Sequence, residues 1–163
     1  AYGVAITTFV GQNFCAREYG RMHKSVKVCM LMAAGTTIVT SVLFCVFASP
    51  LISLFSTDAA VLQEVLSIMR QLAPWYITFV CIEILSGAIR GTGDSLIPML
   101  ITCGGVCVLR VVWIFAVLPL HRTFSTLIVS YPITWIITSV LFVLYYWKGG
   151  WLRRRMALQQ TAE

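Results

Sequence analysis

The chain has 163 residues, of which 59% are apolar and 11% are charged, and its formal net charge is +6. An ordinary soluble domain is roughly 45–50% apolar and about 25% charged, so this composition excludes a soluble globular domain and indicates a surface that faces membrane lipid. The positive residues flank the apolar stretches instead of forming one patch, which argues against a nucleic-acid partner.

The first stretch, Ala1–Val10, is already apolar and ends at three residues with the sequence Gly11, Gln12 and Asn13. We expect it to be the end of a helix that starts before Ala1, so the chain reads as a piece of a longer protein. A polar connector is predicted next, and it carries most of the nearby positive charge, on Arg17, Arg21, Lys24 and Lys27.

Four further stretches are apolar over the roughly 20 residues that a helix needs to cross a bilayer. The predicted spans are residues 26–48, 60–90, 96–120 and 124–147. These lengths predict an all-α integral membrane protein, a polytopic helix bundle. Pro74 lacks a backbone donor inside the second span and is the natural place for a kink, and Pro132 can act likewise in the fourth.

The connectors between the spans alternate in charge. Lys and Arg residues in short loops mark the cytoplasmic side of a membrane protein. The basic segments are Arg17–Lys27, Arg90–Asp94 and Lys148–Arg155, whereas Ser49–Ala60 contains no Lys or Arg. The sequence therefore predicts a multi-pass protein of the plasma membrane or bacterial inner membrane, with a basic cytoplasmic tail at residues 148–163.

The six cysteines do not form a metal-binding or disulfide pattern. No C-x-x-C pair occurs, and five of the six lie inside apolar stretches, where Cys behaves as a small hydrophobic residue. The sequence also lacks a phosphate-binding Gly-rich loop, an H-E-x-x-H motif and a nucleophile elbow. We therefore expect no metal site, no cofactor and no enzymatic activity.

Two charged residues, Glu83 and Arg110, lie deep inside the predicted spans. A charge at such depth is costly and usually faces a protein interior or an aqueous cavity. Three interpretations remain open. Glu83 titrates or binds a cation during transport, or it forms a static ion pair with Arg110, or Arg110 pairs with a residue outside this chain.

Other polar and aromatic residues share helix faces with these charges. Helical spacing places Tyr76 and Phe79 on the face of Glu83, and Thr36 and Thr40 form part of a hydroxyl stripe in the first span. A second stripe in the last span consists of Ser130, Thr134 and Thr138. Such hydroxyls more often donate to their own helix than line a path. The candidate cavity residues are Glu83, Arg110, Tyr76, Phe79, Thr36 and Thr40.

Three motifs together resemble the multidrug and toxin extrusion (MATE) family. Val10–Ala16 looks like the loop after that family's eighth helix, with Cys15 in place of the usual Gly, a change that can tighten or shift the turn. Leu54–Val61 looks like the loop before its tenth helix. Ser86–Ser95 looks like the turn between its tenth and eleventh helices, and includes Arg90 and Gly91.

The resemblance covers the C-terminal half of such a transporter, from the end of helix eight through helix twelve. It implies a twelve-helix protein with two lobes, so the N-terminal lobe of the same chain is the expected partner. It also implies an antiporter that exports cationic or amphipathic compounds in exchange for Na⁺ or H⁺ by alternating access. Glu83 falls on the tenth helix, where some members carry a functional carboxylate.

Two other classes of function remain as alternatives. The first is a flippase of polysaccharide or lipid-linked precursors from the same superfamily, which would line its cavity with several positive charges. The second is a non-transporting membrane scaffold or a membrane-embedded enzyme, which would cluster Asp or His near one membrane face. The coupling ion stays open, because acidic residues in the other parts of the family's fold also contribute to coupling.

Overall fold

The computed structural model describes residues 1–53, 58–117, 119, 124–148 and 150–161, and the regular structure in this part of the chain is entirely helical. The elements are α1 (Tyr2–Cys15), α2 (Tyr19–Val46), α3 (Ala48–Ser53), α4 (Ala59–Leu72), the 3₁₀ turn η1 (Ala73–Trp75), α5 (Tyr76–Gly91), α6 (Leu96–Thr102), the π-helical turn η2 (Cys103–Val108), α7 (Leu109–Ala116), α8 (Phe124–Trp147) and α9 (Gly150–Thr161). The predicted all-α bundle is confirmed.

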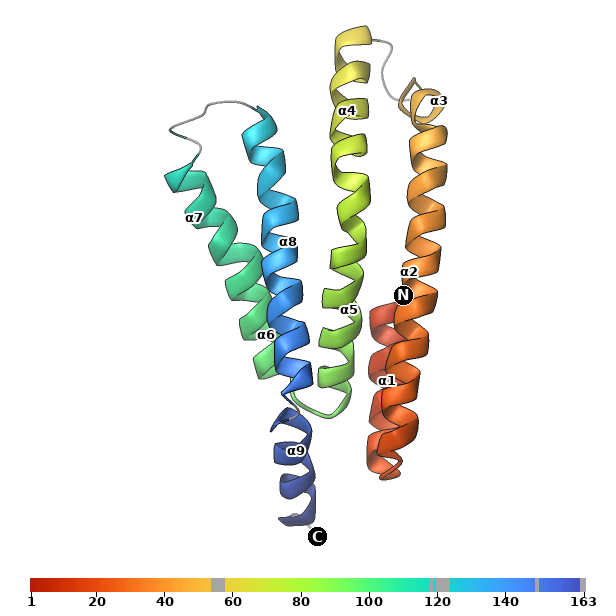
Figure 1. Cartoon of the computed structure of the whole chain (residues 1–163), viewed down its shortest axis with the longest axis vertical. Coiled ribbons are helices and arrows are strands. Elements are labelled where there is room, and N and C mark those ends of the chain that lie inside the picture. Colours follow the sequence, from red (N-terminus) through yellow and green to blue (C-terminus); the bar gives the residue numbers. More distant parts are fainter. Residues whose placement is uncertain (54–57, 118, 120–123, 149, 162–163) are drawn as a thin grey trace.

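Four continuous helical segments of the described chain are long and apolar enough to cross a membrane. They are Tyr19–Val46, Ala60–Gly91, Leu96–Ala116 and Thr126–Trp147. Each overlaps one of the four predicted spans, in the same order. The second segment consists of α4, η1 and α5 stacked end to end, and the third consists of α6, η2 and α7 (Figure 1).

The first helix is longer than the sequence suggested. α1 continues through the predicted end at Gly11, Gln12 and Asn13 and reaches Cys15, so that prediction is wrong. Asn13 does not stop the helix because its side-chain amide donates a hydrogen bond to the carbonyl oxygen of Phe9, at 2.7 Å. The turn to α2 then follows within three residues and includes Arg17 at a positive φ of 60°.

The predicted polar connector is therefore mostly helix. α2 begins at Tyr19, so its first three turns carry three of the four basic residues assigned to the connector: Arg21, Lys24 and Lys27. Lys and Arg are good helix formers, and their long side chains keep the charge in water while the backbone continues into the membrane. The apolar composition predicted the part of this helix that lies in the membrane, but it did not predict the polar first turns of the same helix.

The core of the bundle lies where α5 contacts α1, α2 and α8 (Figure 1). α1 and α5 approach closely because Gly87 and Gly91 of α5 have no side chains to separate the helices. A methyl group at Gly87 would lie 2.6 Å from the carbonyl oxygen of Gly3, and one at Gly91 would lie 2.6 Å from that of Thr7. The Thr7 hydroxyl donates to the carbonyl oxygen of Gly87 at 3.0 Å, which joins the two helices.

The two prolines inside the spans behave differently. Pro74 lies in η1, the 3₁₀ turn that separates α4 from α5, as expected for a residue without a backbone donor. α8 continues as an α-helix through Pro132, from Phe124 to Trp147.

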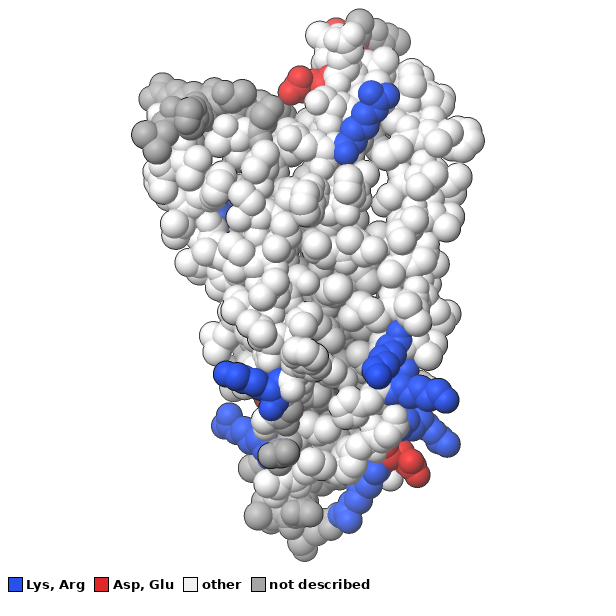
Figure 2. Space-filling model, in the orientation of Figure 1, with Lys and Arg blue, Asp and Glu red and all other residues white. Residues whose placement is uncertain are grey.

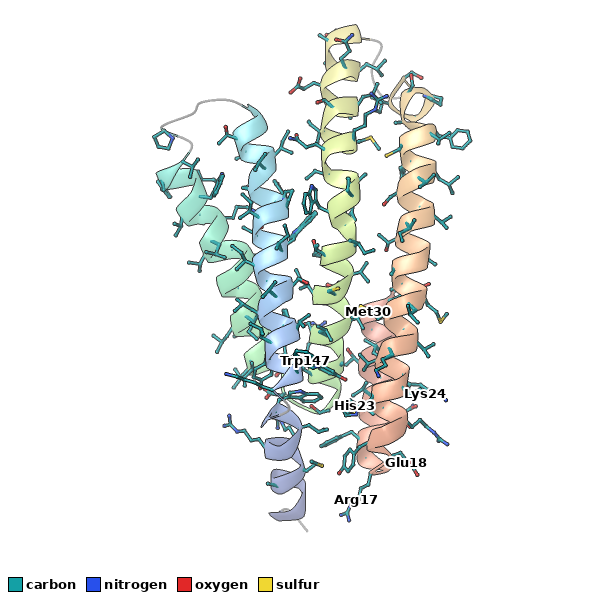
Figure 3. All side chains as sticks on the ribbon, in the orientation of Figure 1. Arg17, Glu18, His23, Lys24, Met30 and Trp147 are labelled. Carbon is teal, nitrogen blue, oxygen red and sulfur yellow. The ribbon has the colours of Figure 1, made fainter. Side chains whose placement is uncertain are left out.

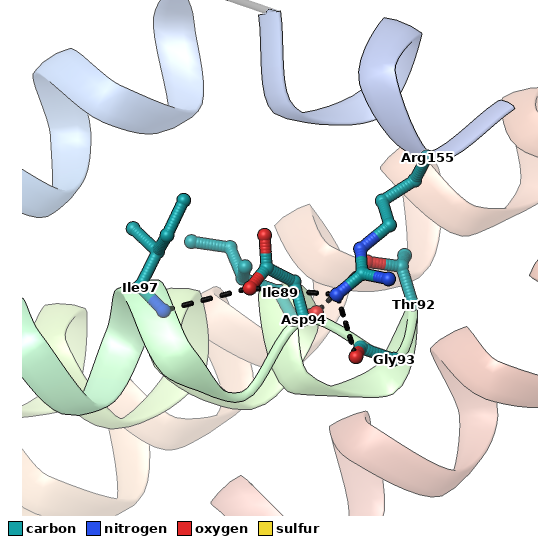
Figure 4. A network of polar contacts seen from close by, with 6 residues as sticks. All are labelled: Ile89, Thr92, Gly93, Asp94, Ile97 and Arg155. Atoms are coloured by element: carbon teal, nitrogen blue, oxygen red, sulfur yellow. Dashed lines mark hydrogen bonds and ion pairs between the residues drawn. The ribbon is translucent and has the colours of Figure 1, made fainter. Parts of the chain in front are cut away.

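The predicted basic tail folds into α9 and docks on the turn between α5 and α6. Arg155 donates a hydrogen bond to the carbonyl oxygen of Gly93 at 2.7 Å, and its guanidinium lies 3.5 Å from the carboxylate of Asp94 (Figure 4). Gly93 has a φ of 86°, a conformation that suits glycine at this tight turn. Asp94 also accepts a long hydrogen bond, of 3.5 Å, from the backbone of Ile97 at the start of α6.

Candidate functional site

A cavity of about 690 Å³ lies between α2 and the segment formed by α4, η1 and α5. Its lining residues are Tyr2, Thr36, Thr37, Thr40, Ser41, Phe44, Cys45, Ile68, Met69, Leu72, Ala73 and Tyr76. Three of the predicted cavity residues, Thr36, Thr40 and Tyr76, are therefore brought together. This volume falls within the range of about 300–1,000 Å³ that is common for small-molecule sites.

The hydroxyl groups of α2 give one wall of the cavity its polarity. The Thr36 hydroxyl donates within its own helix, to the carbonyl oxygens of Met32 at 3.0 Å and Ala33 at 3.1 Å. A hydroxyl has one donor and two acceptor positions, so a donating Thr36 oxygen still accepts from a ligand. This wall is thus chemically suited to ligands that donate hydrogen bonds.

An aromatic cluster connects the cavity to α8. Tyr76 lines the cavity, and its ring centroid lies 5.5 Å from that of Trp135. Phe79 does not line the cavity and packs against the same tryptophan, also at 5.5 Å. Tyr131, one turn earlier on α8, meets Trp135 edge to face at 6.0 Å. The faces of such rings attract cations.

Arg110 binds to the far side of this cluster. Its guanidinium carbon lies 3.9 Å from the ring centroid of Tyr131, and one of its terminal nitrogens is 3.5 Å from the Thr134 hydroxyl oxygen. The Nε atom of Arg110 is buried without a hydrogen-bond partner in the structure. The side chain is therefore held by α8 through a cation–π contact and one long hydrogen bond.

Glu83 lies against α1 instead of Arg110. A methyl group at Gly3 would collide with the Glu83 carboxylate, whose nearer oxygen would be 2.5 Å away. Within the described chain, no ion pair joins Glu83 to Arg110. Glu83 is seven residues, or two turns, after Tyr76 on one face of α5, and Gly3 is next to Tyr2, which lines the cavity. The carboxylate thus lies below the cavity, on its α1 side.

The motif residues pack the helices together. Gly11 and Gly91 come from different motifs yet lie opposite each other, with 3.1 Å between a methyl group placed at Gly11 and the carbonyl oxygen of Gly91. Gln12 and Arg90 are exposed at this end of the bundle, whereas Asn13 is buried. Residues 54–57 of the second motif lie outside the described residues.

The hydroxyl stripe of α8 bonds to its own helix. Ser130, Thr134 and Thr138 donate to the carbonyl oxygens of residues 127, 131 and 134, at 2.6, 3.0 and 2.6 Å. All three are almost fully buried. The self-bonding interpretation is confirmed for this stripe, and these hydroxyls support packing instead of lining the cavity.

No group of three His, Cys, Asp or Glu side chains in the described residues is arranged to hold a metal ion, and the six cysteines are free.

Sequence reasoning missed two parts of the site. Tyr131 and Trp135 are spaced four residues apart on α8, so helical periodicity could have placed them on one face. The π-helical turn η2 was also missed, although it contains the only adjacent glycines inside a predicted span, Gly104 and Gly105. Such turns occur often at functional positions.

Comparison with known proteins identifies a family and two relatives. The model of the MatE family matches residues 1–116. The chain is 27% identical over 164 aligned residues to a probable multidrug resistance protein NorM from Aromatoleum aromaticum, covering 99% of this chain and 35% of the relative. It is 30% identical over 97 residues to multidrug and toxin extrusion protein 2 from Oryctolagus cuniculus, covering 57% of this chain and 16% of the relative. The chain thus spans about a third or less of the length of these curated relatives.

Proposed function

The chain belongs to the MatE family, and from this premise we propose that it is the C-terminal part of an ion-coupled antiporter that exports cationic or amphipathic compounds. The relatives that carry multidrug resistance and extrusion in their names support drug export as the broad function. The N-terminal lobe of the same protein would complete the cavity, and alternating access would expose it to each side of the membrane in turn.

The observation that carries the proposal is the cavity beside the aromatic cluster. An amphipathic cation needs apolar contacts for its body and electron-rich groups for its charge. Phe44 and Leu72 supply the first, and the Thr36 oxygen and the Tyr76 ring supply the second. A flippase of anionic precursors would need a basic cavity, and none of the residues that line this one is Lys or Arg.

Glu83 is the residue that we assign to ion coupling. A carboxylate at this depth is costly unless it serves a function or has a partner. The contacts of Arg110 with Tyr131 and Thr134 weaken the alternative of a static pair between Arg110 and Glu83. In the proposed cycle, Glu83 binds Na⁺ or H⁺ when the substrate leaves, and releases it when the next substrate enters.

The orientation of the chain is part of the proposal. Lys and Arg gather at the lower end of the molecule, over the lower parts of α1 and α2 and over α9 (Figure 2). The positive-inside rule then puts this end, and the C-terminus with it, in the cytoplasm of a plasma or bacterial inner membrane.

Replacing Glu83 in the full-length protein tests the function. Glu83→Gln keeps the size and hydrogen bonding of the side chain but removes its charge. We expect normal folded yield and loss of Na⁺- or proton-driven efflux of a cationic dye. Glu64→Gln, on the exposed surface of α4, is the matched control and should transport normally. Ion-driven efflux at the normal rate from folded Glu83→Gln protein would refute the coupling role.

A further inference from the structure

A second groove, of about 430 Å³, runs between α1 and α2. Its lining residues are Tyr2, Ala5, Ile6, Phe9, Arg21, Lys24, Ser25, Val28, Cys29 and Met32. Only Tyr2 is shared with the lining of the cavity described above, and none of the lining residues belongs to a family motif.

The groove changes from basic to apolar along its length. The α2 residues that line it follow helical spacing, so they form one stripe from Arg21 to Met32. That stripe is about 16 Å long at 1.5 Å per residue. Arg21 and Lys24 lie at its lower end, and the half-exposed side chains of Phe9 and Val28 lie further along it.

The two cations of the groove have no acidic partner in the described chain. Arg21 and Lys24 are exposed and make no ion pair with its residues. Figure 3 places Lys24 on the lower part of α2, with Glu18 below it. Glu18 is the one acidic residue before Asp58 in the sequence, whereas Arg21, Lys24 and Lys27 are basic. The two charged residues that line the groove are both cations, so the groove carries an excess of positive charge. The Ser25 hydroxyl donates to the carbonyl oxygen of Arg21 at 2.6 Å, which leaves its oxygen to accept.

We propose that this groove is a binding site for one anionic glycerophospholipid. The phosphate of the headgroup contacts Arg21 and Lys24, and an acyl chain lies along the apolar stripe between α1 and α2. Charge-assisted bonds to phosphate favour the two cations, and the surrounding lipid tails favour an occupant whose other end is apolar. A zwitterionic lipid offers the same acyl chain, but its own positive group weakens the attraction to Arg21 and Lys24.

Lipid retention by the purified full-length protein tests the headgroup contact. Delipidated protein in detergent is incubated with phosphatidylglycerol or phosphatidylcholine, and the retained lipid is measured by native mass spectrometry. We expect the double variant Arg21→Gln with Lys24→Gln to retain roughly tenfold less phosphatidylglycerol, while its retention of phosphatidylcholine stays unchanged. Lys27→Gln is the matched control, because Lys27 is exposed on the same helix but outside the groove.

Equal losses in the control and the double variant would mean a general effect of surface charge and would overturn the proposal. Undiminished retention in the double variant would do the same. Because this assay needs no ion gradient, its outcome is independent of the transport proposal.

Photocrosslinking of the unmodified protein tests the acyl contact without any variant. Phosphatidylglycerol with a diazirine in its acyl chain should label peptides that contain Phe9, Val28 or Met32. If another part of the full-length protein covers the groove, these peptides stay unlabelled and the site is not a lipid site. Labelling spread evenly over the outer surfaces of α2 and α7 would likewise contradict a defined site.

Discussion

Gly87 of α5 lies so close to Gly3 of α1 that a single added methyl group would approach the Gly3 carbonyl oxygen to 2.6 Å. The same methyl group would lie 2.7 Å from the side chain of Ile6. Ile6 is almost fully buried, so neither obstacle can move aside easily. The contact between α1 and α5 therefore depends on a residue without a side chain.

We predict that Gly87→Ala destabilises the protein even though Ala is the better helix former. Overpacking should cost about 1–3 kcal/mol, which exceeds the helix-propensity gain of about 0.5–1 kcal/mol. Thermal unfolding of the full-length protein in detergent measures the change. Gly35→Ala in α2 is the control, because a methyl group there meets nothing within 4 Å of this chain. A stability of Gly87→Ala equal to that of Gly35→Ala would contradict the close contact.

The π-helical turn η2 offers a second test, between neighbouring glycines. A methyl group at Gly105 would overlap the Thr138 hydroxyl on α8, whereas one at Gly104 meets nothing within 4 Å. We expect Gly105→Ala to lower the unfolding midpoint and Gly104→Ala to leave it nearly unchanged. Adding Thr138→Ala to Gly105→Ala should recover part of the loss, with a coupling of about 1 kcal/mol. If the effects of Gly105→Ala and Thr138→Ala on stability were simply additive, the close contact between Gly105 and Thr138 would be contradicted.

The charges of Glu83 and Arg110 should act independently on stability. Each contacts a different helix, so a double-mutant cycle with Glu83→Gln and Arg110→Gln should be additive within about 0.5 kcal/mol. Arg110→Gln alone should destabilise the protein, because it removes the cation over the Tyr131 ring. If the double variant instead lost much less stability than the two single variants lose in sum, the two residues would form the ion pair that the structure lacks.

The membrane orientation can be checked with single cysteines in a cysteine-free background. Gln63 is exposed on α4, and Ala16 is exposed directly after the end of α1. Figure 1 shows α4 and the end of α1 toward opposite ends of the bundle. A membrane-impermeant maleimide added to intact cells should label Gln63→Cys at once, and Ala16→Cys only after permeabilisation. The reverse pattern would place the basic end outside the cell.

The sequence predicted the spans well because length and composition alone determine whether a helix can cross a membrane. It predicted the helix ends less well. Arg21 and Lys24 were assigned to a connector because they are charged, but a helix can begin outside the hydrocarbon layer and carry such residues in its first turns. The hydropathy of a segment reports where lipid begins, whereas hydrogen bonding decides where a helix begins.

The partner of Arg110 could not be deduced by counting residues. Counting from the α5–α6 turn assumes 3.6 residues per turn, and η2 breaks this assumption with a wider turn just before Arg110. One residue more or less before a given position rotates its side chain by about 100° around the helix axis. A π-helical turn therefore changes which neighbouring helix the side chain of Arg110 faces. Thr36, inside the regular helix α2, and Tyr76, directly after the 3₁₀ turn η1, both line the same cavity. Their part in substrate binding stays a prediction.

The docking of α9 on the α5–α6 turn has a mechanical consequence. α8 touches α5 within the membrane, and α9, which continues from α8, grips the end of α5 again through Arg155 and Gly93. Because α5 is attached at two different heights, to α8 and to α9, rotation of α5 against α8 would break one of the two contacts. We therefore expect a tilt of α5 to carry α8 and α9 with it, so that the three helices move together.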